Sequence, residues 1–208
     1  RHYADAYSAD DEIVLVRAPG RVNLIGEHTD YNGLPVMPMA ISRDVLVMAA
    51  RATGGAVQIT NVEGMFEPRN FALARHIPPY QPGDWGNYVK SAMQGLIDYW
   101  QSADGLSGMR MAISGNVPVA SGLSSSAAFT IACALALLHT HQRALDPLVF
   151  ADVMAHSDHY VGMASGGMDQ AASILGRAGA CLKIDFFPLR VQPVNLPPQT
   201  AIVVCHSR

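Results

Sequence analysis

Short runs of β-branched and aliphatic residues, separated by Gly, Pro or charged positions, occupy the first third of the chain. Such runs are typical of strands, because branched side chains fit the pleated, half-buried surface of a sheet. The runs predict strands at 13–17, 22–25, 44–50 and 56–60. We therefore expect the first third of the chain to be mainly sheet.

The pattern changes to helical spacing after residue 84. Between residues 85 and 100, the apolar residues Val89, Met93, Leu96 and Trp100 are four, three and four positions apart. This spacing places them along one stripe of an amphipathic helix. We expect that stripe to face the sheet.

The remaining segments predict a mixture of helices and strands. An Ala/Leu-rich segment predicts a mostly buried helix over 124–139, and Pro147, a residue favoured in the first turn, predicts a helix over 147–160. The other expected elements are strand 109–114, a turn-rich loop at 115–122, a short helix at 169–175, strands 180–185 and 200–205, and surface loops at 78–82 and 193–198. Because helices do not alternate regularly with strands, an α+β fold is favoured over a doubly wound parallel sheet.

Composition narrows the functional class. The chain has 14 basic and 17 acidic residues, for a formal charge of −3, whereas proteins that bind nucleic acid usually carry a clear basic excess. Half of its residues are apolar, enough for a globular core. The longest nearly apolar run, 127–138, is shorter than the roughly 20 residues that cross a bilayer. We therefore expect neither nucleic acid nor a membrane as partner, and a monomer is the default expectation.

The cysteines and the two ends of the chain indicate where in the cell the protein is located and whether the chain is a fragment. The three cysteines are an odd number without metal-ligand spacing, and residues 1–11 are polar and acidic, unlike a signal peptide. These features favour a cytoplasmic location. The chain has no initiator Met and stops just after the strand expected at 200–205. We therefore expect it to be a fragment.

A Gly/Ser-rich loop at 115–127 leads into the buried helix expected at 124–139. The N-terminus of a helix presents unpaired N–H groups and a positive partial charge, so small residues there allow an anion to approach the backbone. An ordinary serine N-cap is the alternative. Because capping needs one hydroxyl, the surplus serines among Ser124, Ser125 and Ser126 could hold a metal or phosphate oxygens. The loop lacks the Lys of a Walker motif.

A second group of polar residues lies near the N-terminus. Arg21, Glu27, His28 and Asp30 fall within ten residues that also contain glycine. Carboxylates accept hydrogen bonds from hydroxyl groups, and a guanidinium or an imidazole donates them, so the set suits a polyol such as a sugar. The alternative interpretation is a charged turn after a strand.

Four segments of the chain resemble one enzyme family. The segment 118–127, Pro-Val-Ala-Ser-Gly-Leu-Ser-Ser-Ser-Ala, resembles the second signature motif of the GHMP small-molecule kinases, and 17–33 is similar to the N-terminal signature of galactokinases. The segment 162–170 resembles the galactokinase segment that carries the catalytic base. The segment 85–90 resembles the galactokinase segment near the adenine pocket. The Gly-Gly-Met-Asp-Gln form of 166–170 favours the branch that contains the N-acetylgalactosamine kinases.

This resemblance implies a fold and an activity. The fold is the α+β N-terminal domain of GHMP kinases, similar to the second domain of ribosomal protein S5, over residues 1–208 and without the C-terminal domain. The activity is phosphorylation of galactose by ATP and Mg²⁺ at the anomeric C1 hydroxyl. The alternatives are an N-acetylgalactosamine kinase and a non-catalytic galactose- and ATP-binding sensor; the intact serine run favours an enzyme. We expect the fragment alone to be weakly active or inactive.

The resemblance also assigns roles to residues. It makes Asp169 the catalytic base and Arg21 its electrostatic partner. The residues expected to bind the sugar are Arg21, Glu27, His28, Asp30, Gly166 and Asp169, and those expected to bind ATP are Trp85, Gly122, Leu123, Ser124, Ser125 and Ser126. Ser126 and Asp158 are the expected Mg²⁺ ligands, although family members usually have Glu near the position of Asp158.

Overall fold

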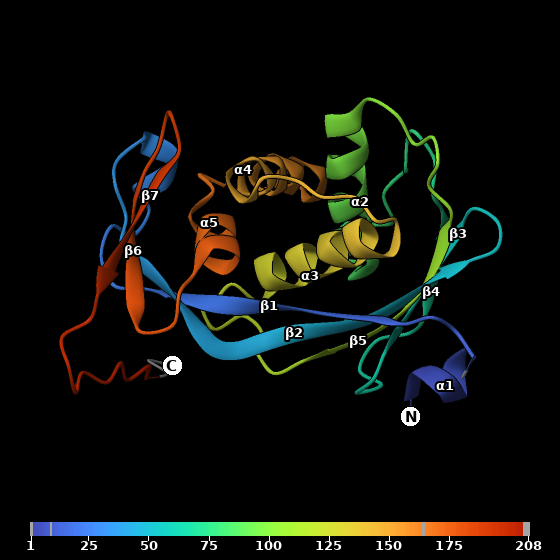
Figure 1. Cartoon of the computed structure of the whole chain (residues 1–208), viewed down its shortest axis with the longest axis horizontal. Coiled ribbons are helices and arrows are strands. Elements are labelled where there is room, and N and C mark those ends of the chain that lie inside the picture. The colour runs from blue at the N-terminus through green and yellow to red at the C-terminus, as the bar shows by residue number, and fades with distance from the viewer. Residues whose placement is uncertain (1, 9, 164, 206–208) are drawn as a thin grey trace.

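The computed structural model describes residues 2–8, 10–163 and 165–205 (Figure 1). Its main feature is a five-stranded sheet with the order β1-β2-β5-β3-β4. The strands are β1 (Val14–Asn23), β2 (Pro38–Ala52), β3 (Ala56–Asn61), β4 (Arg69–Ala72) and β5 (Gly108–Gly115). Strands β3 and β5 are parallel, and the other neighbouring pairs are antiparallel. The sheet is therefore mixed, as an α+β fold allows.

Four helices cover one face of this sheet (Figure 1). They are α2 (Gly86–Trp100), α3 (Ser125–Thr140), α4 (Pro147–Ser157) and α5 (Met168–Leu175), and the 3₁₀ turn η2 (Asp158–Val161) follows α4. Alternate residues of β2, among them Val45 and Val47, point into the core that the helices share, as the period of a strand requires. Helix α3 lies at the centre of this layer and is buried on nearly every side.

The opposite face of the sheet is covered in part by α1 (His2–Ala6). Its Tyr3 is 1% exposed and packs against Ala50 of β2 and Ala112 of β5. These two alanines belong to the alternate set of strand positions that point away from the four helices. Helix α1 therefore fills a small core of its own.

A second, two-stranded sheet of β6 (Ala180–Asp185) and β7 (Arg190–Asn195) stands beside α5 (Figure 1). It has its own apolar cluster, which includes Met168 and Leu182. A single bridge between Val36 and Ile184 connects it to the loop that contains the 3₁₀ turn η1 (Asp30–Asn32). This contact holds the polar N-terminal segment next to α5.

The structure confirms the predicted α+β class and most of the predicted elements. The strands predicted at 13–17 and 22–25 form the single strand β1, whose pairing with β2 shifts between Pro19 and Arg21. The helix predicted over 147–160 is α4 followed by η2, and Asp146 caps it by accepting from two backbone N–H groups.

Two predictions from the sequence need correction, and two elements were not anticipated. The strand predicted at 200–205 is wrong: residues 201–205 are exposed and have no regular secondary structure, because apolar character makes a strand only where a neighbour supplies hydrogen bonds. The loop predicted at 193–198 is partly wrong, because Pro193 lies in β7, where an edge strand tolerates a missing N–H group. Helix α1 and strand β4 were not predicted.

None of the helices in the described part of the chain has both the length and the apolar character that a bilayer crossing requires.

Candidate active site

The loop between β5 and α3 is held against β1 by a close backbone contact. A Cβ atom at Gly20 would lie 2.6 Å from the carbonyl oxygen of Leu123, so only glycine fits at that position. The N–H group of Arg21 donates a hydrogen bond to the same oxygen at 3.1 Å. The irregular pairing of β1 at this point thus fixes the loop and the start of α3.

Ser124 precedes α3 but does not cap it through its side chain. Among the described residues, its hydroxyl makes no hydrogen bond to the first turn of α3, whereas the Asp146 carboxylate caps α4. The Ser124 hydroxyl instead donates to Oδ2 of Asp169 at 2.5 Å. The first N–H groups of α3 are therefore left without a side-chain acceptor, which is the condition under which a helix N-terminus binds an anion.

Arg21 and Asp169 form an ion pair beside this helix end. Nε and Nη2 of Arg21 each lie 2.6 Å from Oδ1 of Asp169, and Nη1 donates to the carbonyl oxygen of Gly122 at 2.5 Å. Arg21 is 8% exposed, and the carboxylate of Asp169 compensates its buried positive charge. Asp169 lies in the first turn of α5, where the helix dipole favours a negative charge.

These contacts bring together three groups that are far apart in the sequence. The acid comes from α5, the guanidinium from β1 and the hydroxyl from the loop before α3. We call Arg21, Gly122, Ser124 and Asp169 the acid network.

The acid network lines a cavity of about 560 Å³. Every residue expected to bind ATP lies in the wall of this cavity: Trp85, Gly122, Leu123, Ser124, Ser125 and Ser126. Its volume is in the range of small-molecule sites. The cavity thus joins the helix end that can hold an anion to the ion pair of Arg21 and Asp169.

One wall of the cavity is a stack of aromatic rings. The ring of Trp85 lies between those of Phe66 and Phe129, at centroid distances of 5.6 and 6.0 Å, and its Nε1 donates to the carbonyl oxygen of Glu67 at 3.1 Å. Phe66, Tyr88 and Phe129 also line the cavity. Of these four aromatic residues, the sequence indicated only Trp85 as part of a binding site. The positions of Tyr88 and Phe129 on helices carried no signal, because aromatic residues on a helix normally indicate core.

A carboxylate on the loop after β3 also lines the cavity. Glu63 accepts hydrogen bonds from the Ser114 hydroxyl at 2.5 Å and from the Asn61 amide at 2.9 Å. Burial opposes ionisation of Glu63, but these hydrogen bonds outweigh it and lower the pKa of the carboxyl group. This acidic position was not recognised in the sequence.

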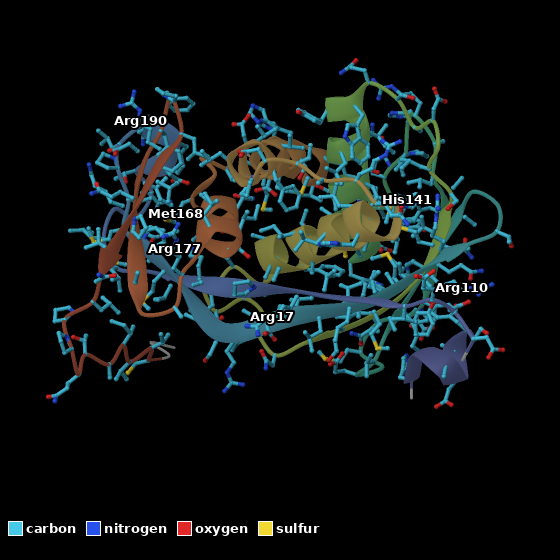
Figure 2. All side chains as sticks on the ribbon, viewed as in Figure 1. Arg17, Arg110, His141, Met168, Arg177 and Arg190 are labelled. Carbon is cyan, nitrogen blue, oxygen red and sulfur yellow. The ribbon has the colours of Figure 1, made fainter. Side chains whose placement is uncertain are left out.

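Two of the residues expected to bind a sugar, Gly166 and Asp30, meet where the segment before α5 packs on η1. Gly166 packs directly on η1: a Cβ atom there would lie 2.5 Å from the carbonyl carbon of Asp30 and would also collide with the backbone nitrogen of Tyr31. Asp30 is 8% exposed. Figure 2 labels Met168, which follows this segment at the start of α5 and directly precedes Asp169.

Glu27 and His28 are positioned differently. Both are exposed, and Glu27 accepts a hydrogen bond from the Asn23 amide at 2.9 Å. His28 has a φ of 58°, a left-handed conformation in the turn before η1. Within the described chain, neither residue lines the cavity that contains the acid network. They belong to the turn that immediately precedes η1, which begins at Asp30.

The two expected metal ligands lie in different surroundings. Ser126 lines the cavity, whereas Asp158 is 5% exposed and accepts a hydrogen bond from Nε2 of Gln170 at 2.8 Å. Burial, helped by the nearby charge of Asp169, raises the pKa of Asp158. The serine hydroxyls in the cavity wall are oxygen donors of the kind that Mg²⁺ accepts beside phosphates. Direct ligation by Asp158 would require it to leave its contact with Gln170.

Two family models match the chain. Residues 1–51 match the galactokinase galactose-binding signature, and residues 87–177 match the N-terminal domain of GHMP kinases. The galactokinase of Candida maltosa is 38% identical over 184 residues, which are 86% of this chain and 85% of that protein. The galactokinase of Dictyostelium discoideum is 33% identical over 99% of this chain but only 42% of its own length. The chain thus spans less than half the length of that relative.

Solved structures show the same arrangement of elements. Lactococcus lactis galactokinase complexed with galactose superposes with a TM-score of 0.85 at 28% identity, covering 94% of this chain and 50% of that chain. The mevalonate kinase of Methanococcus jannaschii superposes with a TM-score of 0.72 at 22% identity, covering 88% of this chain and 56% of that chain. The second likeness is one of fold alone.

Proposed function

This chain belongs to the galactokinase family and has the fold of a GHMP kinase N-terminal domain, and from that premise we propose that the protein containing it phosphorylates galactose at the C1 hydroxyl, with ATP as donor. Residues 1–208 would form its ATP- and sugar-binding domain. The observation that carries the proposal is the acid network in the wall of the cavity. It brings together a carboxylate that can orient the attacking hydroxyl, a guanidinium that can offset phosphoryl charge and a helix N-terminus that can hold phosphate oxygens.

The volume of the cavity and the residues that line it support a nucleotide as the proposed ligand. Its uncapped helix end would bind phosphate oxygens through the N–H groups of Ser125 and Ser126, and its aromatic wall would pack against a base around Trp85. ATP supplies the γ-phosphoryl group, and Mg²⁺ offsets its charge. Ser126 would hold the metal, and Asp158 would contribute to the metal site only after releasing Gln170 or through water.

Asp169 would act on the sugar hydroxyl. It accepts the proton that the C1 hydroxyl releases as the hydroxyl oxygen bonds to phosphorus and the bond between that phosphorus and the departing ADP oxygen breaks. Arg21 keeps the carboxylate oriented and places a positive charge next to the transferring group. Arg21 also donates a hydrogen bond to the carbonyl oxygen of Gly122. It therefore fixes the position of Asp169 relative to the loop between β5 and α3, which would bind the phosphates.

The sugar would lie on the side of Asp169 that faces η1. Asp30 and Gly166 are in direct contact there, and Glu27 and His28 precede Asp30 by three and two positions in the sequence. Carboxylates accept sugar hydroxyl hydrogens, and the closeness of Gly166 brings its backbone to the same place. The solved galactokinase that contains galactose supports a sugar as the small-molecule partner.

The proposal can be tested by measuring ADP release from the full-length protein with ATP, Mg²⁺ and galactose. The Asp169→Asn variant should lose roughly 100-fold or more in turnover, the usual contribution of a general base, and should still bind galactose. Asp152→Asn is the matched control, because Asp152 is an exposed acid on α4. It should retain the wild-type rate.

Two results would contradict the proposal. Absence of galactose-dependent ADP release in the wild-type protein would overturn the kinase activity; galactose binding without turnover would indicate a sensor. Faster turnover with N-acetylgalactosamine than with galactose would replace the proposed substrate. Near-full activity of Asp169→Asn would remove the base role from Asp169.

A further inference from the structure

We propose that Ser124 is a positioning residue that orients the Asp169 carboxylate through its hydroxyl. This inference rests on the proposed function, because it concerns the acid that acts on the sugar hydroxyl. It assigns to the Ser124 side chain a task other than capping α3 or contacting the nucleotide. Three features of Ser124 support this role: its backbone conformation, its hydrogen bond to Asp169 and its place before α3.

The backbone of Ser124 adopts an unfavourable conformation for a residue with a side chain. Its φ and ψ are 56° and 45°, in the left-handed region that glycine enters freely. Other residues lose about 1 kcal/mol or more there. Glycine would relieve this strain, so the serine side chain must contribute something that offsets it. It does not supply the cap of α3 in the described structure.

The hydroxyl contacts the oxygen of Asp169 that Arg21 leaves free. Nε of Arg21 donates to Oδ1 and Nη2 lies 2.6 Å from the same oxygen, whereas Ser124 donates to Oδ2 at 2.5 Å. Two donors on opposite oxygens fix the plane of the carboxylate, since rotation about its last bond would break both contacts. Each carboxylate oxygen has two acceptor positions, so Oδ2 can still receive a sugar proton while it accepts from Ser124.

The same contact connects the acid to the phosphate loop. Ser124 directly precedes α3, whose first residues Ser125 and Ser126 line the cavity, and Asp169 lies in the first turn of α5. The hydrogen bond therefore spans the gap between the phosphate-binding end of one helix and the acid of another. A displacement of about 1 Å between reacting groups can reduce a rate by about 100-fold. Loss of this contact should impair turnover more than binding.

The experiment compares Ser124→Ala and Ser124→Gly in the full-length protein. Both variants remove the hydroxyl, and only glycine also removes the backbone strain. We expect kcat with galactose to fall roughly 10- to 100-fold in both variants, while the galactose KM and the ATP dissociation constant stay within about twofold of wild type. Ser124→Gly should melt at a higher temperature than Ser124→Ala.

Gln142 provides the matched control pair. It is exposed, lies just beyond the end of α3 and has a φ of 52°, close to that of Ser124. Gln142→Gly should melt higher than Gln142→Ala, as in the Ser124 pair, with kcat unchanged in both. This control separates the effect of strain relief from the effect of the lost hydroxyl.

Three outcomes would overturn the inference. An unchanged kcat in Ser124→Ala would show that the hydroxyl does not position the acid. A raised ATP dissociation constant with full kcat at saturation would assign the hydroxyl to nucleotide binding. Wild-type kcat in Ser124→Gly, with low kcat in Ser124→Ala, would trace the effect to the backbone.

A second measurement does not depend on turnover. If the hydroxyl contacts the carboxylate, Ser124→Ala and Asp169→Ala should lower the melting temperature less in combination than the sum of their separate effects. Additive effects would overturn the contact. If the wild-type protein shows no galactose-dependent turnover, the proposed kinase function fails, and this comparison still tests the contact between the two residues.

Discussion

Replacing Gly166 by Ala tests how the segment before α5 is joined to η1. The new methyl carbon would lie 2.5 Å from the carbonyl carbon of Asp30 and 2.6 Å from its Cγ, and would also collide with the nitrogen of Tyr31. Two of these neighbours are backbone atoms, which cannot rotate away. Ordinary contact begins near 3.4 Å, so the two segments must separate by about 1 Å.

The size of this displacement gives the expected effect. Overpacking a tight contact typically costs about 1–3 kcal/mol, and a backbone collision belongs to the upper part of that range. The separation moves Asp30, a proposed sugar ligand, relative to Asp169. If the same free energy, about 2–3 kcal/mol, is lost from sugar binding, the galactose dissociation constant rises roughly 30- to 150-fold. Calorimetric titration of the full-length variant with galactose, together with its melting temperature, measures both effects.

Gly55→Ala provides the control for this experiment. A Cβ atom at Gly55 would meet only the Leu73 carbonyl oxygen, at 4.0 Å, so the change adds a methyl group without a collision. It should leave galactose affinity unaltered. If Gly166→Ala matched Gly55→Ala in both affinity and melting temperature, the close packing of the segment on η1 would have no role in sugar binding.

Further predictions concern a buried histidine, the guanidinium and the aromatic wall. Burial lowers the pKa of His141, labelled in Figure 2, so the folded state binds fewer protons than the unfolded state and stability should fall as the pH drops below about 6.5; His141→Gln should weaken this loss in melting curves at several pH values. Arg21→Lys keeps the charge but cannot bind Asp169 and the loop together, so ADP release should fall about 10-fold or more, and an unchanged rate would show that charge alone suffices. Trp85→Ala removes the middle ring of the stack and should raise the ATP KM about 2- to 10-fold. An equal rise in the galactose KM would contradict a role restricted to the nucleotide.

Much of the site could be anticipated because its components are local. The serine run at 124–126 and the polar turn at 27–30 each lie within a few residues, and their spacing indicated an anion site and a polyol site. The aromatic wall was mostly missed, because Phe66 and Phe129 come from a loop and a helix that meet only in the folded chain. The same limit applies to Asp158, whose burial against Gln170 is a property of packing.

The sequence by itself determined the elements whose pattern is repeated over several turns or strand positions. Apolar spacing was enough to place α2, Ala/Leu-rich composition was enough to place α3, and alternating or branched runs were enough for the centre of β2 and for β3 and β5. Segments with only a few residues of pattern were not determined in this way. Residues 200–205 are as apolar as a strand but remain exposed, and β7 forms despite Pro193 because β6 lies beside it.

Only the tertiary structure decided which chemical groups meet. The sequence separates Arg21 from Ser124 and Asp169 by 101 or more residues, and no local pattern encodes that one carboxylate receives the guanidinium on one oxygen and the hydroxyl on the other. That meeting depends on the packing of α3 and α5 against β1, and on a glycine in β1 small enough for the loop to approach. Residue types define what each group can do, whereas close packing of distant segments defines where it can do it.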